Sequence, residues 1–512
     1  MIKVFLRHNT VYIKQMLQQL IRIAFGKHTD GMGTMDRQNR KKMNTHSPNG
    51  RYHNLVLRFV KMINACAMAI PFAFAWYVYY ADKIRVPYVR RGNWVIILLF
   101  LLLYVIFGRT YEAFMVSYNR ISEMIYSQML AVVISYTIYY VIICLLAGKM
   151  MHVWPLLLAI FHSLLISIAW SIFAHRWYFK TFRPRRTAIV WEDRKGLDEL
   201  VDSYGLEKKF EVLKIISAEE CINDLSLLKD MQAVFFSGVH SHDRNIIIKY
   251  CVQNKITSFI IPRVGDVLMS GAKRMPMFHL PMLRLDRYNP SPEYLFVKRL
   301  FDILASSIAL VILSPVMIIF AILIKMDGGP AFYKQRRLTK DGKEFDVLKF
   351  RSMGTDAEKD GVARLSTGEN DPRITPIGRV IRKYRIDELP QLLNILKGDM
   401  SIVGPRPERP EIAAQYEKEL PEFRLRLQAK CGLTGYAQVY GKYNTTPYDK
   451  LQMDLMYIAK PSLAQDLSII FATIKIIFLP ESTEGVKEGQ TTAMTNSHIV
   501  HGTYRANDNG KS

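Results

Sequence analysis

Residues 371–407 read DPRITPIGRVIRKYRIDELPQLLNILKGDMSIVGPRP, which is the most informative stretch of the chain. An acidic pair, Asp387 and Glu388, stands between several basic residues and an arginine, Arg406, that two prolines enclose. The prolines restrict the backbone and would preset the direction of the arginine side chain. Cations that gather phosphate beside a carboxylate able to attack phosphorus are typical of phosphoryl transfer. The stretch therefore predicts a site of phosphate chemistry.

The local structure around the acidic pair follows from apolar spacing. Residues 376–389 carry apolar side chains at helical intervals with basic residues between them, which predicts an amphipathic interfacial helix that stops at Pro390. Neighbouring helical residues point about 100° apart, so Asp387 and Glu388 can face one site only if the helix end is irregular. Upstream, residues 331–353 predict two strands around the turn Asp341-Gly342.

Length and charge limit the classes of function. A chain of 512 residues should hold more than one domain, and its net charge of +24 fits nucleic acid, anionic lipid or phosphorylated substrates as partners. No zinc-finger spacing, basic heptad helix or RNP-type strand is present, so nucleic acid is the weakest of these and we predict no nucleic-acid partner. The five scattered cysteines contain no CxxC pair and predict reduced thiols.

Four apolar runs, at about 57–80, 94–108, 127–148 and 153–174, predict a bundle of four transmembrane helices within residues 57–178. Each run alone could be a buried core helix, but four in succession, separated by short charged loops, favour a membrane. Lysines and arginines flank the first and fourth runs, which places both flanks, including the basic segment 1–56, in the cytoplasm. The loop after the first run opposes this topology, because it carries Lys83, Arg85, Arg90 and Arg91 on the outer side.

Residues 187–290 alternate strand-like and helix-like segments, which predicts a small parallel sheet of Rossmann type. A dinucleotide-binding version would carry GxGxxG after the first strand. The chain has Glu192, Asp193, Arg194 and Lys195 before Gly196 instead. We therefore expect a degenerate Rossmann-like domain with a structural or regulatory role.

A fifth apolar run, 303–324, follows Lys298, Arg299 and Asp302 and has Ser314-Pro315 at its midpoint. Proline removes a helical hydrogen bond, and serine can satisfy the freed carbonyl. The run could cross the membrane or could bend, dip into one leaflet and return, and the residues alone leave both readings open. The polar tail 481–512 is predicted to be disordered.

Several motifs downstream of Lys298 resemble a known family. These are KRxxD with a mid-helix Ser-Pro, KFRSM, DPRITxxGRxxR, DELPQLxNxLKGDMSxVGPRPE and GLTGxAQVxG. They resemble the bacterial sugar transferases that start exopolysaccharide, capsule and O-antigen (lipopolysaccharide) assembly, the monotopic polyprenyl-phosphate phosphoglycosyl transferases. The predicted spans and α/β domain are similar to the large subgroup typified by undecaprenyl-phosphate glucose- or galactose-phosphotransferases.

The resemblance implies an α+β monotopic catalytic domain over 291–480, with a re-entrant membrane helix at about 298–325, on the cytoplasmic face of the bacterial inner membrane. It implies transfer of a hexose-1-phosphate, of glucose or galactose, from a UDP-sugar to undecaprenyl phosphate. A covalent phosphosugar-aspartate forms on the way, and UMP is released. Expected partners are the UDP-sugar, undecaprenyl phosphate and membrane lipid, while a homo-oligomer is left open.

The same resemblance implies roles for individual residues. Asp387 matches the nucleophile and is the best single protein ligand for the expected Mg²⁺, and Glu388 would handle protons or help to hold the metal. Without the flanking motifs, a solvated helix end would be the better reading of this pair. The remaining implied residues fall into phosphate-binding arginines (Arg382, Arg406), a phosphate clamp or hairpin salt bridge (Lys349, Arg351), and residues that fix the re-entrant helix (Arg299, Asp302, Ser314, Pro315).

The chain departs from the family pattern in one motif. Cys431, Tyr436 and Lys442 stand where the family usually has Pro, Trp and Arg in PGLTGWAQVxGR, so details of donor binding cannot be transferred there. Two other functions are alternatives. An inactive scaffold or regulator of polysaccharide assembly is opposed by the intact acidic pair and Arg406. A membrane-anchored nucleotide-sugar dehydratase would need a working glycine-rich loop and a Tyr-x-x-x-Lys pair, which the chain lacks. The identity of the sugar and the pathway cannot be read from the sequence.

Overall fold

The computed structural model describes residues 51–88, 92–194, 196–203, 205–288, 290–326, 328–354, 371, 373–441 and 445–477. Contacts divide the chain into two compact units, of which the first runs to Phe259 and the second begins at Ile260, with Asp193–Lys195 belonging to the second. Most of the predicted basic segment 1–56, the predicted disordered tail 481–512, and Lys442 lie outside the described residues.

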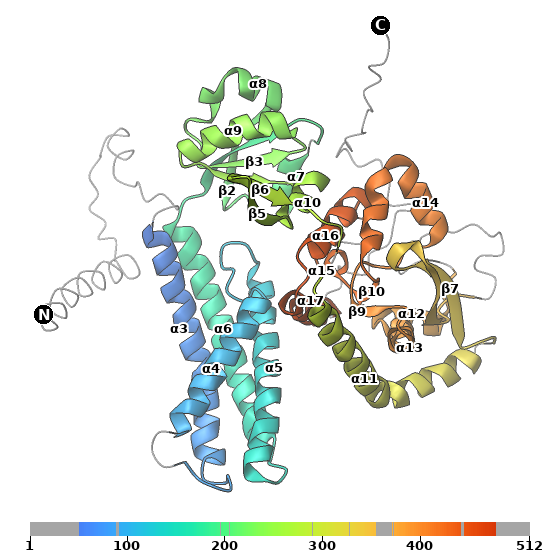
Figure 1. The fold of residues 1–512 in the computed structure, drawn as a ribbon. Helices are drawn as coiled ribbons and strands as arrows, with labels where there is room; N and C mark the ends of the chain where they lie inside the picture. Colours follow the sequence, from blue (N-terminus) through green and yellow to red (C-terminus); the bar gives the residue numbers. More distant parts are fainter. Residues whose placement is uncertain are drawn as a thin grey trace, which may run out of the picture. The chain divides into compact units, whose positions relative to one another are not determined.

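The first unit begins with a bundle of long apolar helices, which Figure 1 shows side by side. They are α3 (Arg51–Ala75), continued by the π-helix η1 (Trp76–Tyr80), α4 (Gly92–Thr110), α5 (Ile121–Ala147) and α6 (Trp154–Thr181). Each coincides with one of the four predicted apolar runs, and each is long and apolar enough to cross a membrane.

One buried polar network joins all four of these helices. Tyr104 of α4 donates to Asn64 of α3 at 2.8 Å, and Asn64 donates to Gln128 of α5 at 3.3 Å. Ser167 of α6 donates to the same Gln128 oxygen at 2.8 Å. Because an unpaired polar group is costly in an apolar surrounding, these bonds favour one mutual arrangement of the four helices.

The rest of the first unit is a four-stranded sheet in the order β2-β1-β3-β4. The strands β1 (Arg185–Trp191), β2 (Phe210–Ser217), β3 (Ala233–Ser237) and β4 (Thr257–Ile260) alternate with α7 (Leu197–Ser203), α8 (Ala218–Asn223), η2 (Leu225–Leu228) and α9 (Ser241–Gln253). β1 pairs in parallel with both β2 and β3, and Val190, Phe236 and Ile247 are buried in the core between sheet and helices. The predicted alternation of strands and helices is confirmed.

An acidic turn follows β1 where a dinucleotide-binding sheet would have glycines. The Glu192 carboxylate accepts a hydrogen bond from the backbone N–H of His240 at 2.8 Å and lies 2.5 Å from the His240 ring nitrogen Nδ1. His240 is the residue that precedes α9. A side-chain anion thus occupies the start of α9, and it pairs with the backbone N–H group there.

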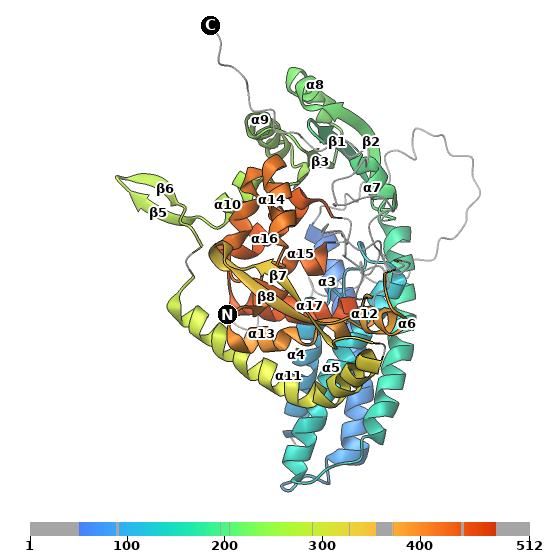
Figure 2. The ribbon, with the colours of Figure 1, turned by 90° about the vertical axis from the view of Figure 1, so that its right-hand side faces the viewer.

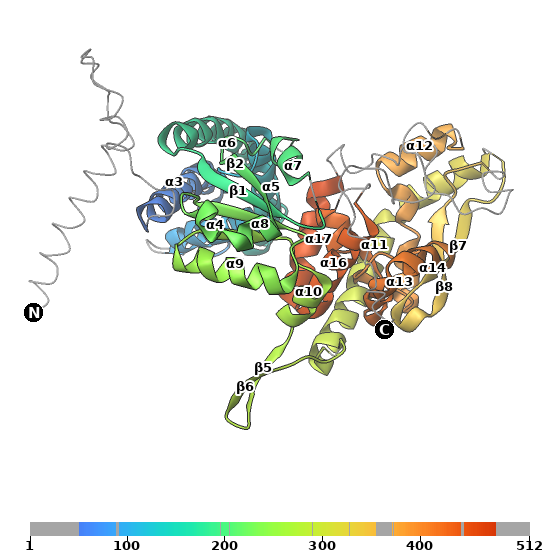
Figure 3. The same ribbon diagram turned by 90° about the horizontal axis from the view of Figure 1, so that it is seen from above.

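The second unit opens with α10 (Val264–Ser270) and a hairpin of β5 (Lys273–Met277) and β6 (Leu280–Arg284), which Figure 3 shows extending as a separate arm. Val267 of α10 is buried in the same core as Leu451 and Leu455. Residues 260–290, which the sequence assigned to the α/β domain, therefore belong by their contacts to the second unit.

The remaining elements of the second unit combine helices with short strand pairs. They are α11 (Pro292–Met326), β7 (Phe332–Leu338), η3 (Lys340–Gly342), β8 (Glu344–Phe350), α12 (Pro376–Lys383), η4 (Ile386–Glu388), α13 (Gln391–Lys397), β9 (Ser401–Val403), α14 (Pro410–Glu419), η5 (Pro421–Gln428), β10 (Gly432–Thr434), α15 (Tyr436–Tyr440), α16 (Pro447–Ala459) and α17 (Leu463–Ile477). β7 and β8 are antiparallel around Asp341, whose φ of 58° is left-handed, so the predicted hairpin is confirmed. β9 and β10 pair in parallel.

The long apolar helix α11 is bent along its length, as Figures 1 and 2 show. Pro315 has no N–H to donate to the carbonyl of Val311, and the Ser314 hydroxyl donates to that carbonyl at 2.8 Å instead. The predicted replacement of the missing bond by serine is therefore confirmed.

Both halves of α11 pack on the same domain. Before the proline, Leu310 and Leu313 contact the cluster around Val347 and Leu392. After it, Met317, Phe320 and Ile324 contact the cluster that contains Phe350 and Ile381.

The charged residues at the start of α11 also attach it to this domain. Lys298 pairs with the carboxylate of Asp466 at 3.0 Å. Arg299 donates to the carbonyls of Ile395 and Leu396, at 2.6 and 2.7 Å, and the carboxylate of Asp302 accepts from the backbone N–H of Ile402 at 3.0 Å. Each charged residue of the KRxxD motif therefore contacts protein groups that lie far away in the sequence.

Candidate active site

The acidic pair lies on an irregular turn between two helices. α12 ends at Lys383, Arg385 takes a left-handed conformation with φ of 54°, and Asp387 and Glu388 form the 3-10 turn η4 before α13 begins at Gln391. The irregularity that the pair requires is confirmed, but the predicted helix to Leu389 is too long. Ile381 is fully buried against Ile324 and Phe350, so an apolar position expected to face the membrane surface packs inside the protein.

Three cations surround the carboxylate of Glu388. The guanidinium of Arg406 lies 3.3 Å from Oε1, the Lys349 ammonium lies 3.9 Å from the same oxygen, and Arg385 lies 3.9 Å from Oε2. Burial alone would raise the pKa of Glu388, but the charges of Arg406, Lys349 and Arg385 outweigh burial and hold that pKa well below its usual value. Glu388 is therefore an ionised carboxylate whose negative charge is balanced by these cations.

Asp387 has a different environment from its neighbour. Among the described residues, no cation lies within ion-pair distance of its carboxylate. Burial, and then the negative charge of Glu388, raise the pKa of Asp387, and the more distant charges of Lys349, Arg382 and Arg406 only partly offset them. A carboxylate with a raised pKa and no direct counter-ion is the more basic of the two, and so the better nucleophile toward phosphorus.

The other predicted cations differ in how they relate to the acidic pair. Lys349 lies beside Glu388, and burial, the largest effect, lowers its pKa to about 8. Arg382 acts on Asp387 through its charge, without a hydrogen bond to the pair in the described structure. Arg351 points elsewhere, because its buried guanidinium donates to the Ile324 carbonyl of α11 at 2.9 Å. The structure thus brings Lys349 and Arg406 to the pair and places Arg351 against the helix.

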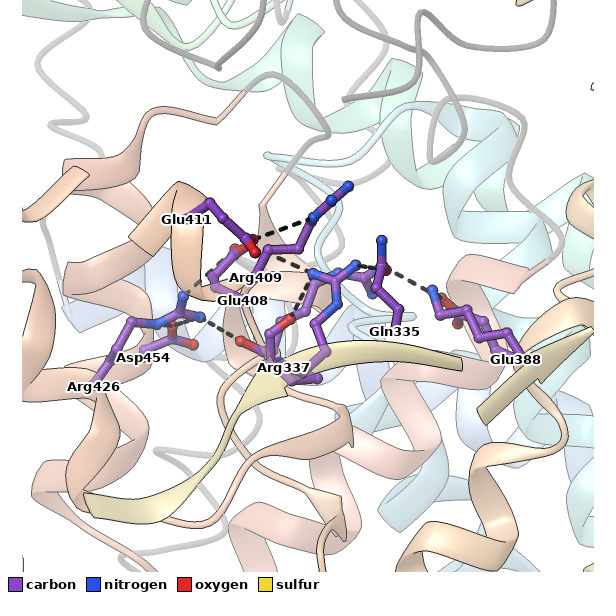
Figure 4. Close-up of polar contacts among 11 residues, drawn as sticks. Gln335, Arg337, Glu388, Glu408, Arg409, Glu411, Arg426 and Asp454 are labelled. Atoms are coloured by element: carbon purple, nitrogen blue, oxygen red, sulfur yellow. Dashed lines mark hydrogen bonds and ion pairs between the residues drawn. The ribbon is translucent and has the colours of Figure 1, made fainter. Parts of the chain in front are cut away.

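Several residues near Arg406 were not predicted from the sequence. Arg426 and Asp454 form a buried ion pair at 2.6 Å, and Glu408 lies between Arg337 and Arg426, as Figure 4 shows. Arg385, which contacts Glu388, was also outside the predicted site, although its spacing of three residues from Glu388 was a usable signal. The Arg426–Asp454 pair gave no such signal, because in the sequence a buried charge looks like a solvated one.

The grouping of carboxylates in the structure bears on the predicted Mg²⁺. No cluster of three or more His, Cys, Asp or Glu residues occurs among the described residues. Mg²⁺ is usually held by one or two carboxylates and completed by substrate phosphate oxygens and water. Asp387 beside Glu388 fits a site of that kind, in which the substrate supplies much of the coordination.

Comparison with known proteins gives one family match and several curated relatives. The sequence profile of the family described as "Bacterial sugar transferase" matches residues 293–480. The UDP-N-acetylgalactosamine-undecaprenyl-phosphate N-acetylgalactosaminephosphotransferase of Aeromonas hydrophila is 40% identical over 231 residues, covering 44% of this chain and 53% of that protein. The undecaprenyl-phosphate galactose phosphotransferase of Salmonella typhimurium is 32% identical over 319 residues, covering 58% and 65%.

A third relative is matched over nearly its whole length. The exopolysaccharide production protein PSS of Rhizobium leguminosarum is 43% identical over 190 residues, which is 35% of this chain and 94% of that protein. The chain therefore spans nearly all of this shorter relative, but only between about half and two thirds of the length of the first two.

Proposed function

Because the chain belongs to the bacterial sugar transferase family, we propose that it transfers a sugar 1-phosphate from a UDP-sugar to undecaprenyl phosphate, as the first membrane step in making a bacterial surface polysaccharide. The single observation that carries this proposal is the difference in environment between the two carboxylates of the acidic pair. Glu388 is neutralised by three cations, while Asp387 keeps a more basic carboxylate that has no direct counter-ion within the described part of the chain.

The reaction we propose has two displacement steps at one phosphorus atom. An oxygen of Asp387 attacks the phosphorus that bears the sugar, the bond from that phosphorus to the bridging oxygen breaks, and UMP leaves with this oxygen. An oxygen of undecaprenyl phosphate then attacks the same phosphorus and displaces the Asp387 carboxylate. The products are undecaprenyl diphosphate-sugar and the restored aspartate, so that no proton or electron is left unaccounted for.

The cations around the pair would bind the diphosphate. Arg406 is the best placed, because its planar guanidinium can form two parallel hydrogen bonds with phosphate oxygens and 41% of its side chain is exposed. Lys349 adds a compact charge, and Arg382 contributes at longer range. Together they would lower the repulsion between the donor phosphates and the attacking carboxylate.

We propose Mg²⁺ as the cofactor, with Asp387 as the protein ligand. When bound with the donor, the ion would neutralise charge on the phosphate oxygens. Glu388 would not be a metal ligand, because its carboxylate already pairs with Arg406 and Lys349 and holds them in place.

We also propose that α3–α6 cross the bacterial inner membrane and that α11 enters it from the cytoplasmic face and returns. Two observations support the return of α11. Its proline bend has a satisfied carbonyl, and both of its halves pack on the same domain. The catalytic domain would then sit at the cytoplasmic face, where UDP-sugars are available.

A panel of donors tests the proposed reaction. Purified full-length protein is incubated with undecaprenyl phosphate and UDP-glucose, UDP-galactose or UDP-N-acetylgalactosamine, and the release of UMP is measured. The family resemblance implies glucose or galactose, whereas the relative from Aeromonas hydrophila is named for N-acetylgalactosamine. We expect UMP from at least one donor and formation of a lipid-linked diphosphosugar. Release of UDP, or no release from any donor, would contradict the proposal.

A further inference from the structure

The loop that carries Arg406 has an unusual pattern of hydrogen bonds. Residues 405–408 follow β9 without regular secondary structure, and two of the four are prolines, which have no N–H to donate. All four backbone carbonyls nevertheless accept a hydrogen bond. The donors are the N–H of Gly432 to Pro405, Arg426 to Arg406, Arg337 to Pro407, and the N–H of Leu338 to Glu408.

Two of these four donors are arginine side chains that are themselves held by carboxylates. Arg426 donates to the Arg406 carbonyl at 2.9 Å and bonds Asp454 through both Nε, at 2.9 Å, and Nη2, at 2.6 Å. Arg337 donates to the Pro407 carbonyl at 3.2 Å. The carboxylate of Glu408 lies 3.5 Å from Arg426 and 4.0 Å from Arg337.

Burial makes this arrangement specific. The side chain of Arg426 is 3% exposed and that of Asp454 is 1% exposed, so neither charge can turn to water for compensation. The Arg426 guanidinium also lies 4.9 Å from the centre of the Phe423 ring, which limits its rotation. A buried arginine that is bonded through Nε and Nη2 and packs against a ring has little freedom to turn, and its Nη2 points to the carbonyl of Arg406.

We propose that Arg426, held by Asp454, and Arg337, paired with Glu408 of the loop itself, are positioning residues that fix the backbone of 405–408 and thereby keep the Arg406 guanidinium beside Glu388. None of the four needs to touch the substrate. The inference rests on the proposed function only for the phosphate that Arg406 would bind, because the contacts that fix the loop are independent of any reaction.

The first test measures the loop directly. Hydrogen exchange followed by mass spectrometry is recorded for the amides of Gly404, Arg406 and Glu408 in full-length protein. In Arg426→Lys, which keeps the charge but loses the planar fork, and in Asp454→Asn, exchange of this segment should become about 10- to 100-fold faster, as expected for the loss of one charge-assisted hydrogen bond. Arg337→Gln, at a less buried site, gives a second route if a buried variant does not fold, and it should also speed exchange here.

Asp466→Asn is the matched control. Asp466 is a buried carboxylate in the same unit that pairs with Lys298, and it has no bond to the 405–408 loop. We expect this variant to lower stability without faster exchange at 404–408. Unchanged exchange in the Arg426, Asp454 and Arg337 variants, or equal acceleration in the control, would overturn the proposal.

The second test asks whether Arg426 acts through Arg406. The rate of UMP release is measured for Arg426→Lys, Arg406→Lys and the double variant. We expect Arg426→Lys to cost about tenfold in the presence of Arg406 and less than twofold in the Arg406→Lys background, because residues that act as one unit are not additive. Full additivity would refute positioning through Arg406. If the unmodified protein releases no UMP, the proposed reaction fails, and the exchange measurement still decides the role of these residues.

Discussion

Gly432→Ala should damage the catalytic domain because two backbones meet closely at this position. A Cβ at Gly432 would lie 2.5 Å from the Thr434 carbonyl oxygen and 2.7 Å from Cα of Gly404, and closer still to the Gly404 nitrogen. All three are backbone atoms, so no side chain can move aside. The strands β9 and β10 would have to separate, which breaks the bonds from Gly432 N–H to Pro405 and from Gly404 N–H to Thr434, both 2.9 Å long.

The size of the effect follows from these two bonds. Leaving buried backbone groups unpaired costs about 1–3 kcal/mol each, so the substitution should destabilise the second unit by roughly 3 kcal/mol. For a domain of this size, such a change lowers the unfolding midpoint by about 6–12 °C. The rate of UMP release should fall as well, because Arg406 is the next residue after Pro405, whose carbonyl loses its hydrogen bond from Gly432.

The chain offers an internal control when thermal unfolding is measured. All six tryptophans belong to the first unit (Trp76, Trp94, Trp154, Trp170, Trp177, Trp191). Tryptophan fluorescence therefore follows unfolding of the first unit, whereas far-ultraviolet circular dichroism follows both. We expect Gly432→Ala to add an earlier transition in circular dichroism and to leave the fluorescence midpoint unchanged.

Gly265→Ala is the matched substitution. Nothing lies within 4 Å of a Cβ at Gly265, which is in the helix α10 of the same unit, so alanine should be neutral or stabilising by up to about 1 kcal/mol. If Gly432→Ala unfolds at the same temperature as Gly265→Ala, the reasoning from close backbone approach is refuted.

Three further predictions follow from the site and from α11. Since burial and the Glu388 charge raise the pKa of Asp387, the rate of UMP release should fall as the pH drops through a value above the usual aspartate range. Glu388→Gln removes this charge and should move the fall in rate to lower pH. A fall at the same pH would argue against an effect of the Glu388 charge on Asp387. Pro315→Ala restores a helical N–H group and removes the cost of about 3 kcal/mol that proline brings to a helix interior, so it should favour a straight α11. Cysteine labelling should then find part of the C-terminal domain on the outer side of the membrane, whereas unchanged labelling would show that Pro315 does not maintain the bend. Arg299→Met removes two bonds to helix-end carbonyls and should lower the circular-dichroism midpoint by about 6–12 °C, and a wild-type melting curve would contradict this anchoring role.

The sequence predicts well those features that depend on local chemistry. Asp341-Gly342 marks the turn of the hairpin because a left-handed residue is needed there, and Ser314-Pro315 marks the bend because proline lacks the donor that serine replaces. In both cases the deciding interaction lies within a few residues. The acidic pair is found through the family motifs that flank it, because two of its cations, Lys349 and Arg406, are distant in the sequence.

Other features depend on partners that are distant in the sequence. Arg351 lies two residues after Lys349, yet it bonds the end of α11 while Lys349 faces Glu388. The helix α12 stops at Lys383 although its apolar spacing continues, because burial of Ile381 fixes its packing and Arg385 turns left-handed. The Arg426–Asp454 pair is likewise visible only once the fold brings η5 and α16 together.

The covalent intermediate on Asp387 is the central claim, and one labelling experiment tests it most directly. Purified protein is incubated with a UDP-sugar that carries radioactive phosphorus in its sugar-bearing phosphate, without undecaprenyl phosphate, and the polypeptide is then digested and analysed. We predict label on the peptide that contains Asp387, its release when undecaprenyl phosphate is added, and none in Asp387→Asn. Transfer to lipid by a protein that never acquires label, or label retained in Asp387→Asn, would contradict the account.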